Sequence, residues 1–162
     1  MIAVMVWLGT NVMSITHPTA RGQGGAILLV EDEPSVQELT EMALQRCGFR
    51  VMSVSDGSEA LSVFNVHGHA ISMVLTDLFL PGLDGAALVR AIRSKDAGVP
   101  IVITSGKCQE DALDELKGLE ISAFLSKPFT VAELTRTVSD ASAHRNAQRL
   151  GGLLPAPVAG FG

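Results

Sequence analysis

Five short apolar runs, each followed by a helix-like stretch, constrain the fold of this chain more than any other feature. Several of the runs are apolar at every position, which is typical of strands covered on both faces of a parallel sheet. The stretches between them have the apolar spacing of amphipathic helices. The expected strands are AILLV (26–30), RVMSV (50–54), SMVLT (72–76), PIVIT (100–104) and AFLS (123–126).

The helix-like stretches have recognisable ends. Pro34 suits a first helical turn, and Gly48 suits a helix C-terminus. Thr130 with Glu133 three residues later forms the pattern of a capping box. The expected helices are 34–47, 58–64, 85–93, about 110–117 and 131–143. Strands that alternate with helices predict an α/β fold, in which right-handed crossovers place helices on both faces of a parallel sheet.

The domain organisation is simple, because 162 residues suffice for one domain and are too few for two ordinary ones. Residues 1–25 are expected to be an N-terminal extension or linker, since most of them lack a helix or strand period. Residues 26–145 are expected to form the folded domain. Residues 146–162 are rich in Gly and Pro and are expected to form a flexible tail.

Composition argues against several classes of function. The net charge is −5 and no Lys/Arg run is present, so direct binding of nucleic acid is disfavoured. The apolar opening, residues 1–9, is too short to span a bilayer and lacks a basic start, so neither a membrane anchor nor a signal peptide is expected. Cys47 and Cys108 lack ligand-like spacing and are interpreted as free thiols in a reducing compartment, which favours a cytoplasmic protein. The histidines are interpreted as solvated residues of linker, loop and tail: His17, His67, His69 and His144.

Polar residues follow four of the five expected strands. Glu31 and Asp32 follow the first strand, Asp77 follows the third, Thr104 ends the fourth, and Lys127 follows the fifth. The carboxyl ends of parallel strands share one edge of the sheet, where ligands bind in such folds. Carboxylates gathered there would repel one another unless a cation neutralised them. Mg²⁺ fits such a set, whereas zinc is disfavoured because no His or Cys falls at this edge.

An Asp at such an edge can act as a nucleophile toward phosphorus and form an aspartyl phosphate. Asp77 is the candidate, with Lys127 and Thr104 placed to contact the phosphoryl oxygens. The alternative is that each acid serves only turn or capping chemistry, which is common for a single Asp at a strand end. Acids gathered together with a lysine and a threonine at one edge favour the chemical interpretation.

Four motifs together resemble one family. ILLVEDE, VLTDLFLPGLDG, PIVITSG and AFLSKPF occur in this order at the strand ends. They are similar to the receiver domains of response regulators and hybrid histidine kinases, over roughly residues 26–143. The resemblance implies a flavodoxin-like receiver fold, a doubly wound five-stranded parallel sheet in the order 2-1-3-4-5.

The resemblance also assigns roles to the residues at the acidic edge. Asp77 matches the phosphoacceptor of the family. Glu31 and Asp32 match the acidic pair that, with Asp77, holds Mg²⁺ or Mn²⁺, assisted by the backbone carbonyl of Phe79. Lys127 matches the lysine that senses the phosphoryl group, and the resemblance implies a cis bond between it and the following proline.

Two further residues match the switch of the family. Thr104 matches the hydroxyl that moves onto the phosphoryl group, and Phe124 matches the aromatic side chain whose rotamer changes with it. Phe124 also has a plain interpretation as a core residue of a short strand. Phe79 stands at a position that influences phosphoryl hydrolysis in the family, and its bulk is hypothesised to restrict water and lengthen the life of the phosphoryl group.

These features together predict the phosphoacceptor receiver domain of a two-component phosphorelay. The expected partners are a sensor histidine kinase or a histidine phosphotransfer protein, and a downstream protein target, without direct contact to nucleic acid or membrane. The residues after the last expected helix are too few for an output module, so a stand-alone receiver and the C-terminal receiver of a hybrid kinase both remain open.

Two other classes of protein share part of this pattern. One is a phosphohydrolase with an Asp nucleophile, but such enzymes usually place a second Asp where this chain has Phe79. The other is a receiver-like module that is never phosphorylated, which the intact Asp77 and Lys127 argue against. The chain is therefore expected to be a signalling module that catalyses only its own phosphorylation and dephosphorylation.

Overall fold

A five-stranded parallel sheet forms the centre of the protein. The structure is a computed structural model that describes residues 25–106 and 115–151, with side chains described as far as residue 143. The strands are β1 (Ala26–Val30), β2 (Val51–Val54), β3 (Ile71–Asp77), β4 (Ile101–Ser105) and β5 (Ala123–Ser126). Their order is β2-β1-β3-β4-β5 and all pairings are parallel, which confirms the predicted topology.

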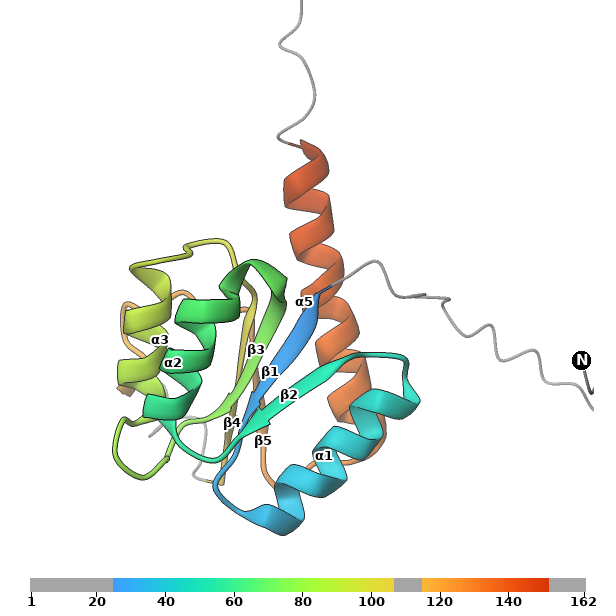
Figure 1. Cartoon of the computed structure of the whole chain (residues 1–162). Coiled ribbons are helices and arrows are strands. Elements are labelled where there is room, and N and C mark those ends of the chain that lie inside the picture. Colours follow the sequence, from blue (N-terminus) through green and yellow to red (C-terminus); the bar gives the residue numbers. More distant parts are fainter. Residues whose placement is uncertain (1–24, 107–114, 152–162) are drawn as a thin grey trace, which may run out of the picture.

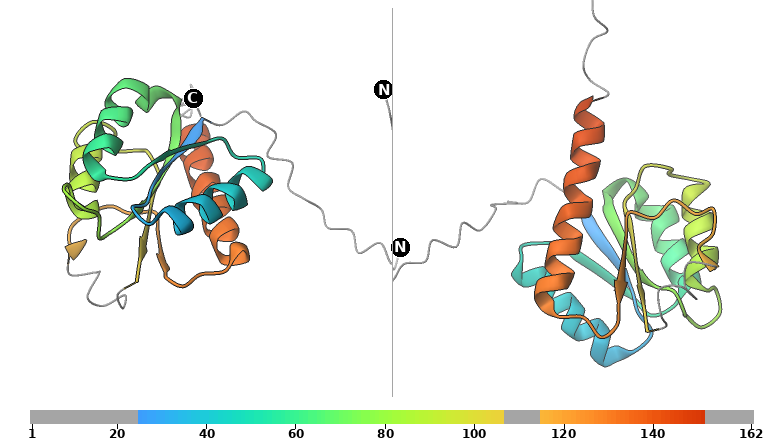
Figure 2. Two further views of the ribbon diagram at one scale, coloured as in Figure 1. Left: turned by 60° about the horizontal axis from the view of Figure 1, so that its bottom comes forward. Right: turned by 180° about the vertical axis from the view of Figure 1, so that it is seen from behind.

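Helices cover both faces of this sheet (Figure 1). One face carries α2 (Gly57–His67) and α3 (Gly85–Arg93), and the other carries α1 (Pro34–Arg46) and α5 (Val131–Gly151). The views in Figure 2 show the same two layers, with α5 running along the sheet and beyond it. Most of the helix expected over residues 110–117 lies outside the described residues.

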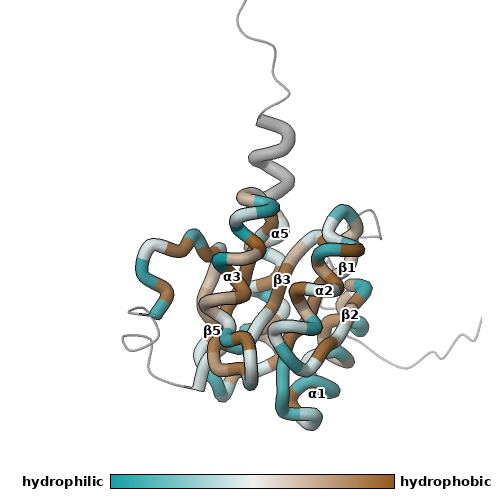
Figure 3. The backbone as a smooth tube through the Cα atoms, turned by 60° about the vertical axis from the view of Figure 1, so that its left-hand side comes forward, coloured by the Kyte–Doolittle hydropathy of each residue, from teal (hydrophilic) through white to brown (hydrophobic). Residues whose placement is uncertain are grey.

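The apolar strands are covered on both faces, as their composition predicted. Along β1, Leu28 and Val30 join a cluster with α2 and α3, whereas Ile27 and Leu29 join a cluster with α1 and α5. All five β1 residues are buried. Figure 3 shows hydrophobic colour along much of the central strands and long hydrophilic stretches on α1. Because both faces of the sheet are covered, ligands are expected at the carboxyl ends of the strands.

The predicted helix ends are confirmed at three positions. Pro34 opens α1, and Gly48 follows its last turn with φ +88°, a left-handed conformation that glycine adopts without strain. Before α5, the Thr130 hydroxyl accepts a hydrogen bond from the Glu133 backbone N–H at 3.2 Å. The Glu133 carboxylate accepts the Thr130 backbone N–H at 2.8 Å. This reciprocal pair is the predicted capping box.

Three strands differ from their predicted bounds. β2 begins at Val51, one residue later than predicted. β3 extends one residue further at each end, and Asp77 is its last residue. β4 begins at Ile101 instead of Pro100, whose ring leaves no N–H to donate to a neighbouring strand.

Two helices are longer than predicted. α2 begins at Gly57, because the Asp56 side chain accepts the Glu59 backbone N–H at 2.8 Å and caps the helix one residue earlier. α5 continues to Gly151, so residues 146–151, which were expected in the tail, are helical.

The described histidines lie in helices. His144 falls within α5 and not in the expected tail. His67 ends α2 and His69 lies in a short 3₁₀ helix (Gly68–Ala70), so neither is a loop residue as expected, although both side chains are exposed. Cys47 is an exposed free thiol, whereas Cys108 and His17 lie outside the described residues. Within the described part of the chain, no helix is long and apolar enough to cross a membrane.

Candidate functional site at the acidic edge of the sheet

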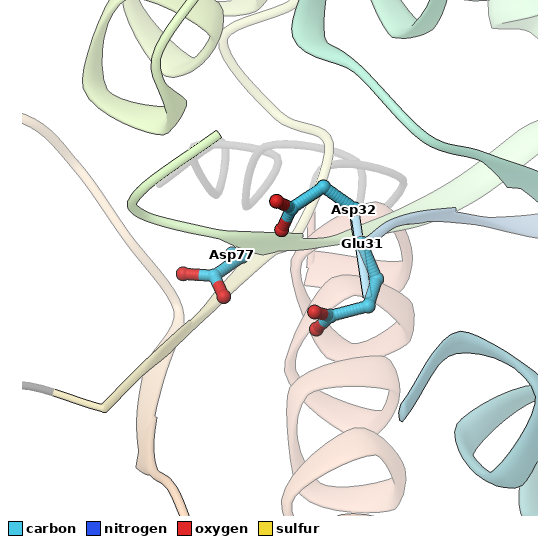
Figure 4. Close-up of side chains that lie close together, drawn as sticks. All are labelled: Glu31, Asp32 and Asp77. Atoms are coloured by element: carbon cyan, nitrogen blue, oxygen red, sulfur yellow. The ribbon is translucent and has the colours of Figure 1, made fainter. Parts of the chain in front are cut away.

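Three carboxylates meet at the carboxyl ends of β1 and β3. Asp77 ends β3, and Glu31 and Asp32 follow β1, which is its neighbour in the sheet. One carboxylate oxygen from each residue lies within 4.8 Å of those of the other two. Figure 4 shows the three side chains gathered around one small space. The structure thus brings together the acids that the sequence predicted to share an edge.

The three acids differ in their exposure. Glu31 is 4% exposed and Asp77 is 8% exposed, whereas Asp32 is open to solvent. Carboxylates seldom lie buried without a cationic partner, because their ionised form is costly to desolvate. The site therefore has a buried floor made by Glu31 and Asp77 and an exposed rim at Asp32.

Lys127 supplies the cation that the two buried acids need. Its Nζ lies 2.6 Å from Glu31 Oε2 and 2.5 Å from Asp77 Oδ2. The loop after β5 delivers this lysine, and its bond to Pro128 is cis, as predicted. Lys127 therefore links the first, third and fifth strands at their carboxyl ends.

The pKa values of this group follow from burial and pairing. Burial raises the pKa of the Glu31 carboxyl above its ordinary 4.5, and the hydrogen bond and charge of Lys127 oppose only part of that rise. Burial acts to lower the pKa of Lys127. The hydrogen bonds from its ammonium to Asp77 and Glu31 outweigh this effect and raise the pKa above 10.5. The lysine consequently stays cationic at any physiological pH.

Both carboxylate oxygens of Asp77 have donors. Oδ2 faces Lys127, and Oδ1 accepts the backbone N–H of Phe79 at 3.0 Å. Gly85, at the start of α3, lies against the same strand end, because a Cβ there would come within 2.3 Å of the Asp77 carbonyl oxygen. The Asp77 side chain is thus held in one orientation within the site.

Thr104 lies beside Asp77 on the neighbouring strand. The two residues are partners in the register of β3 and β4, and Thr104 is 4% exposed. The backbone N–H of Leu78 donates to the Thr104 carbonyl oxygen at 2.9 Å, which ties the two strand ends together. The structure therefore places Thr104 next to the acidic cluster, where the sequence expected it.

The two aromatic residues of interest both touch the core. Phe124 on β5 and Phe79 after β3 are partly buried and pack against the cluster beneath α2 and α3. This contact agrees with the plain interpretation of Phe124 as a core residue and leaves its role in a switch a prediction. The expected role of the Phe79 carbonyl as a metal ligand also stays a prediction.

The donor set of the cluster suits a hard divalent cation. Carboxylate oxygens are the ligands that Mg²⁺ and Mn²⁺ prefer, and Mg²⁺ is commonly held by one or two carboxylates together with waters and phosphate oxygens. Asp32 is the exposed acid of the three, whereas Asp77 and Glu31 are both buried. Lys127 offsets only part of the carboxylate charge, and the remaining negative charge attracts a divalent cation.

One residue of this region was not singled out from the sequence. The Gln37 side-chain amide donates to the backbone carbonyls of Glu31 at 2.9 Å and Val54 at 2.8 Å. A glutamine in the first turns of an amphipathic helix reads as an ordinary surface residue, so the sequence pattern offers no signal for this contact.

The fold and the acidic edge together define a class of protein, the receiver modules of two-component signalling. The family model of the response regulator receiver domain matches residues 27–139. The chain therefore belongs to the response regulator receiver family, as its motifs predicted.

The chain is similar in sequence to longer regulatory proteins. The transcriptional regulatory protein CseB of Streptomyces avermitilis is 36% identical over 114 residues, which are 69% of this chain and 46% of that protein. The DNA-binding response regulator MtrA of Mycolicibacterium smegmatis is 40% identical over 114 residues, 69% of this chain and 48% of that protein. The chain thus spans slightly under half the length of these relatives.

Solved structures share the fold over most of their length. A response regulator receiver protein from Sinorhizobium medicae is 34% identical with a TM-score of 0.69, covering 76% of this chain and 98% of that one. The chemotaxis response regulator CheY4 of Vibrio cholerae is 25% identical with a TM-score of 0.66, covering 73% of this chain and 98% of that one. The flavodoxin-like receiver fold is therefore confirmed.

Proposed function

We propose that this receiver domain accepts a phosphoryl group on Asp77 from a phosphohistidine of a partner protein. The observation that carries the proposal is the geometry of the Asp77 carboxylate in the acidic cluster, held by Lys127 on one oxygen and by the Phe79 N–H on the other. A fixed, partly desolvated carboxylate is suited to attack phosphorus, because little reorganisation precedes the reaction.

The transfer forms one bond and breaks another. A carboxylate oxygen of Asp77 bonds to phosphorus while the bond from phosphorus to the partner's imidazole nitrogen breaks. The electron pair of that bond stays with the imidazole, which leaves as a neutral ring after taking up a proton from solvent. Hydrolysis later replaces the aspartyl oxygen with water and restores the carboxylate. The domain therefore catalyses only its own modification, as a signalling module and not as an enzyme for another substrate.

Glu31, Asp32 and Asp77 would hold the divalent cation that accompanies this reaction, Mg²⁺ or Mn²⁺. The cation supplies charge that screens the carboxylates from an incoming phosphoryl group. The Phe79 carbonyl would complete the protein's share of the ligands. Glu31 is buried and paired with Lys127, so it would contribute mainly by fixing the position of the lysine in the floor of the site.

Lys127 and Thr104 would contact the phosphoryl group once it is bound. Lys127 is already 2.5 Å from Asp77, so its ammonium would pass from the carboxylate to the phosphoryl oxygens. The Thr104 hydroxyl, on the strand beside Asp77, would follow it. Phe124 would then change its packing, which converts a local change in charge into a changed surface near β4 and β5.

The second residue after Asp77 distinguishes a receiver domain from a hydrolase with an Asp nucleophile. That position holds Phe79, which has no group that could act as an acid or base toward a leaving group. Lys127 in contact with Asp77 also argues against a module that is never phosphorylated, because the pairing prepares the carboxylate for an anionic group.

The partners would be a sensor histidine kinase or a histidine phosphotransfer protein, and a downstream target. CseB and MtrA are described as a transcriptional and a DNA-binding regulator, and the chain aligns with slightly under half of each. The acidic net charge of −5 favours an output through protein contacts, not through direct contact with nucleic acid.

Intact-mass measurement after treatment with phosphoramidate and Mg²⁺ tests the proposal. The chain should gain one phosphoryl group, EDTA should prevent the gain, and Asp77→Asn should abolish it. Asp84→Asn is the matched control, because Asp84 caps α3 through the Ala87 N–H and lies outside the acidic cluster. Retention of the adduct in Asp77→Asn would overturn the assignment.

A further inference from the structure

Gln37 lies close behind the acidic cluster, one turn into α1. Its Nε2 donates one hydrogen bond to the Glu31 carbonyl oxygen at 2.9 Å and a second to the Val54 carbonyl oxygen at 2.8 Å. Both hydrogens of the amide group are thereby used, and the side chain is half-buried. One side chain on α1 thus joins the carboxyl ends of β1 and β2.

The same two strand ends are joined by a further bond. The Glu31 backbone N–H donates to the Val54 carbonyl oxygen at 3.2 Å. Both the N–H and the C=O of Glu31 are therefore fixed, one directly to β2 and the other through Gln37. The Glu31 carbonyl and the Asp32 N–H belong to one planar peptide unit, so fixing the carbonyl also fixes the direction in which the chain enters Asp32.

This matters more for Asp32 than for the other acids of the cluster. Glu31 and Asp77 are buried, and Lys127 holds their carboxylates from the side. Asp32 is exposed, and it must nevertheless keep a carboxylate oxygen within 4.8 Å of theirs. Its position consequently depends on the backbone that carries it.

We propose that Gln37 is a positioning residue for the divalent cation: through the Glu31 carbonyl it holds the backbone that places Asp32 in the acidic cluster. The inference rests on the proposed function, in which these acids bind the cation. Groups that orient metal ligands without touching the metal commonly change metal affinity by about 10- to 100-fold when removed. Removing the Gln37 amide is expected to weaken Mg²⁺ binding by about tenfold.

Gln37→Met and Gln45→Met form a matched pair for the test. Methionine keeps the length of glutamine and cannot donate a hydrogen bond. Gln45 lies on the same helix and its amide also donates a hydrogen bond, at 2.7 Å, but this bond is exposed to solvent and its acceptor is the Glu41 side chain. The two substitutions therefore remove the same group from one helix, once beside the acidic cluster and once on the surface.

The experiment is a Mg²⁺ titration of the full chain, monitored through its backbone-amide NMR signals. The midpoint of thermal unfolding is measured for each variant as well. Gln37→Met should raise the Kd for Mg²⁺ by about tenfold, and Gln45→Met should leave the Kd unchanged. The Mg²⁺ concentration for half-maximal phosphorylation by phosphoramidate should rise equally, whereas the rate at saturating Mg²⁺ should stay near that of the natural chain. Where Gln37→Met does not fold, Gln37→Asn, whose shorter amide cannot reach both carbonyls, replaces it.

Three outcomes overturn the inference. An unchanged Mg²⁺ affinity in Gln37→Met with a lowered thermal midpoint would show that Gln37 only ties α1 to the sheet. An equal loss of affinity in Gln45→Met would show that the effect belongs to the helix and not to the contact. Absence of Mg²⁺ binding by the natural chain would overturn the proposed metal site as well. This outcome is distinct from the other two, because it is seen in the natural chain without any variant.

Discussion

At the residue scale, the chemistry of the site depends on one lysine shared by two acids. Lys127 contacts both Glu31 and Asp77, whose carboxylates come from neighbouring strands. Without a cation between them, two buried carboxylates would each raise the other's pKa. The motif KPF located this lysine in the sequence, but its double pairing could not be predicted, because it depends on side-chain positions that the strand pattern does not specify.

Lys127→Met is expected to lower the free energy of unfolding at neutral pH by about 2 kcal/mol, less than a fully buried pair would lose because Lys127 is one-fifth exposed. Burial already raises the pKa of Glu31, and loss of the ammonium raises it further. A raised carboxyl pKa favours the protonated folded state, so this loss should be small below pH 4.5 and grow as the pH rises through the folded pKa.

Urea denaturation at about pH 4 and at neutral pH measures the difference, which follows from the linkage of protonation to folding. Lys95→Met is the control, because Lys95 is an exposed lysine outside the acidic cluster. Equal losses at the two pH values would contradict the assigned pairing.

Phe79→Ala is expected to shorten the life of the phosphoryl group on Asp77 several-fold. The ring lies two residues from Asp77 and packs partly against the core, so its removal opens a path for water. Decay of the phosphorylated mass after removal of the phosphoryl donor measures the rate of dephosphorylation. Phe79→Leu keeps most of the packing, so its rate should lie between those of the natural chain and Phe79→Ala. A decay rate unaffected by Phe79→Ala would show that the ring does not restrict water.

At the element scale, the strands were well predicted and the ends of the helices less well. Runs such as AILLV are apolar at every position, and burial on both faces admits few other interpretations. The start of α2 was missed by one residue, because the Asp56 cap depends on a side-chain contact with the Glu59 N–H. The length of α5 was missed, because its last turns lie among Gly and polar residues that carry little apolar period.

The capping box of α5 is expected to stabilise the folded state. Thr130→Ala is expected to lower the free energy of unfolding by about 1 kcal/mol, since it removes the acceptor of the Glu133 N–H. Thr135→Ala is the control, because Thr135 lies inside the same helix, donates to the Ala132 carbonyl oxygen, and caps nothing. Equal destabilisation by the two substitutions would contradict the assigned cap.

The same box predicts a pH dependence of opposite sign to that of Glu31. Hydrogen bonds from the backbone N–H of Thr130 and then from its hydroxyl lower the pKa of Glu133 below 4.5. A carboxyl group whose pKa is lowered by folding stabilises the folded state at pH values above its pKa in the unfolded chain. This contribution is lost as the pH falls through the folded pKa. Glu133→Gln should therefore reduce the dependence of stability on pH in the acid range, which a series of urea melts below pH 4.5 measures.

At the scale of the whole molecule, the acidic edge opens beside an apolar groove between α1 and the start of α5. The groove has a volume of about 680 Å³, and Lys127 and Glu33 line it together with apolar residues of both helices. Leu39 on α1 is 64% exposed and Val131 on α5 is 61% exposed. The groove was not predicted from the sequence, because it arises from two helices that are far apart in the chain.

A protein that brings a phosphohistidine to Asp77 is expected to dock in this groove, because the groove is apolar and continuous with the site. Leu39→Lys should reduce phosphotransfer from a phosphorylated histidine phosphotransfer protein by about tenfold, as loss of one apolar contact of about 1.4 kcal/mol would. Phosphorylation by phosphoramidate should be unchanged. Val66→Lys on α2 is the control, because Val66 is 67% exposed on the opposite face. Equal loss in both variants, or loss with both donors, would contradict this docking face.

Trapping the phosphoryl bond by chemical reduction tests the central claim most directly. Borohydride reduces an aspartyl phosphate to homoserine and leaves phosphohistidine and phosphoserine unreduced, so the modified position can be read by peptide mass spectrometry. After treatment with phosphoramidate and Mg²⁺, homoserine should appear at position 77 in the natural chain, and EDTA should prevent it. Homoserine at position 32 or at any other acid, or a phosphoryl group that borohydride does not remove, would contradict the assignment of Asp77 as the acceptor.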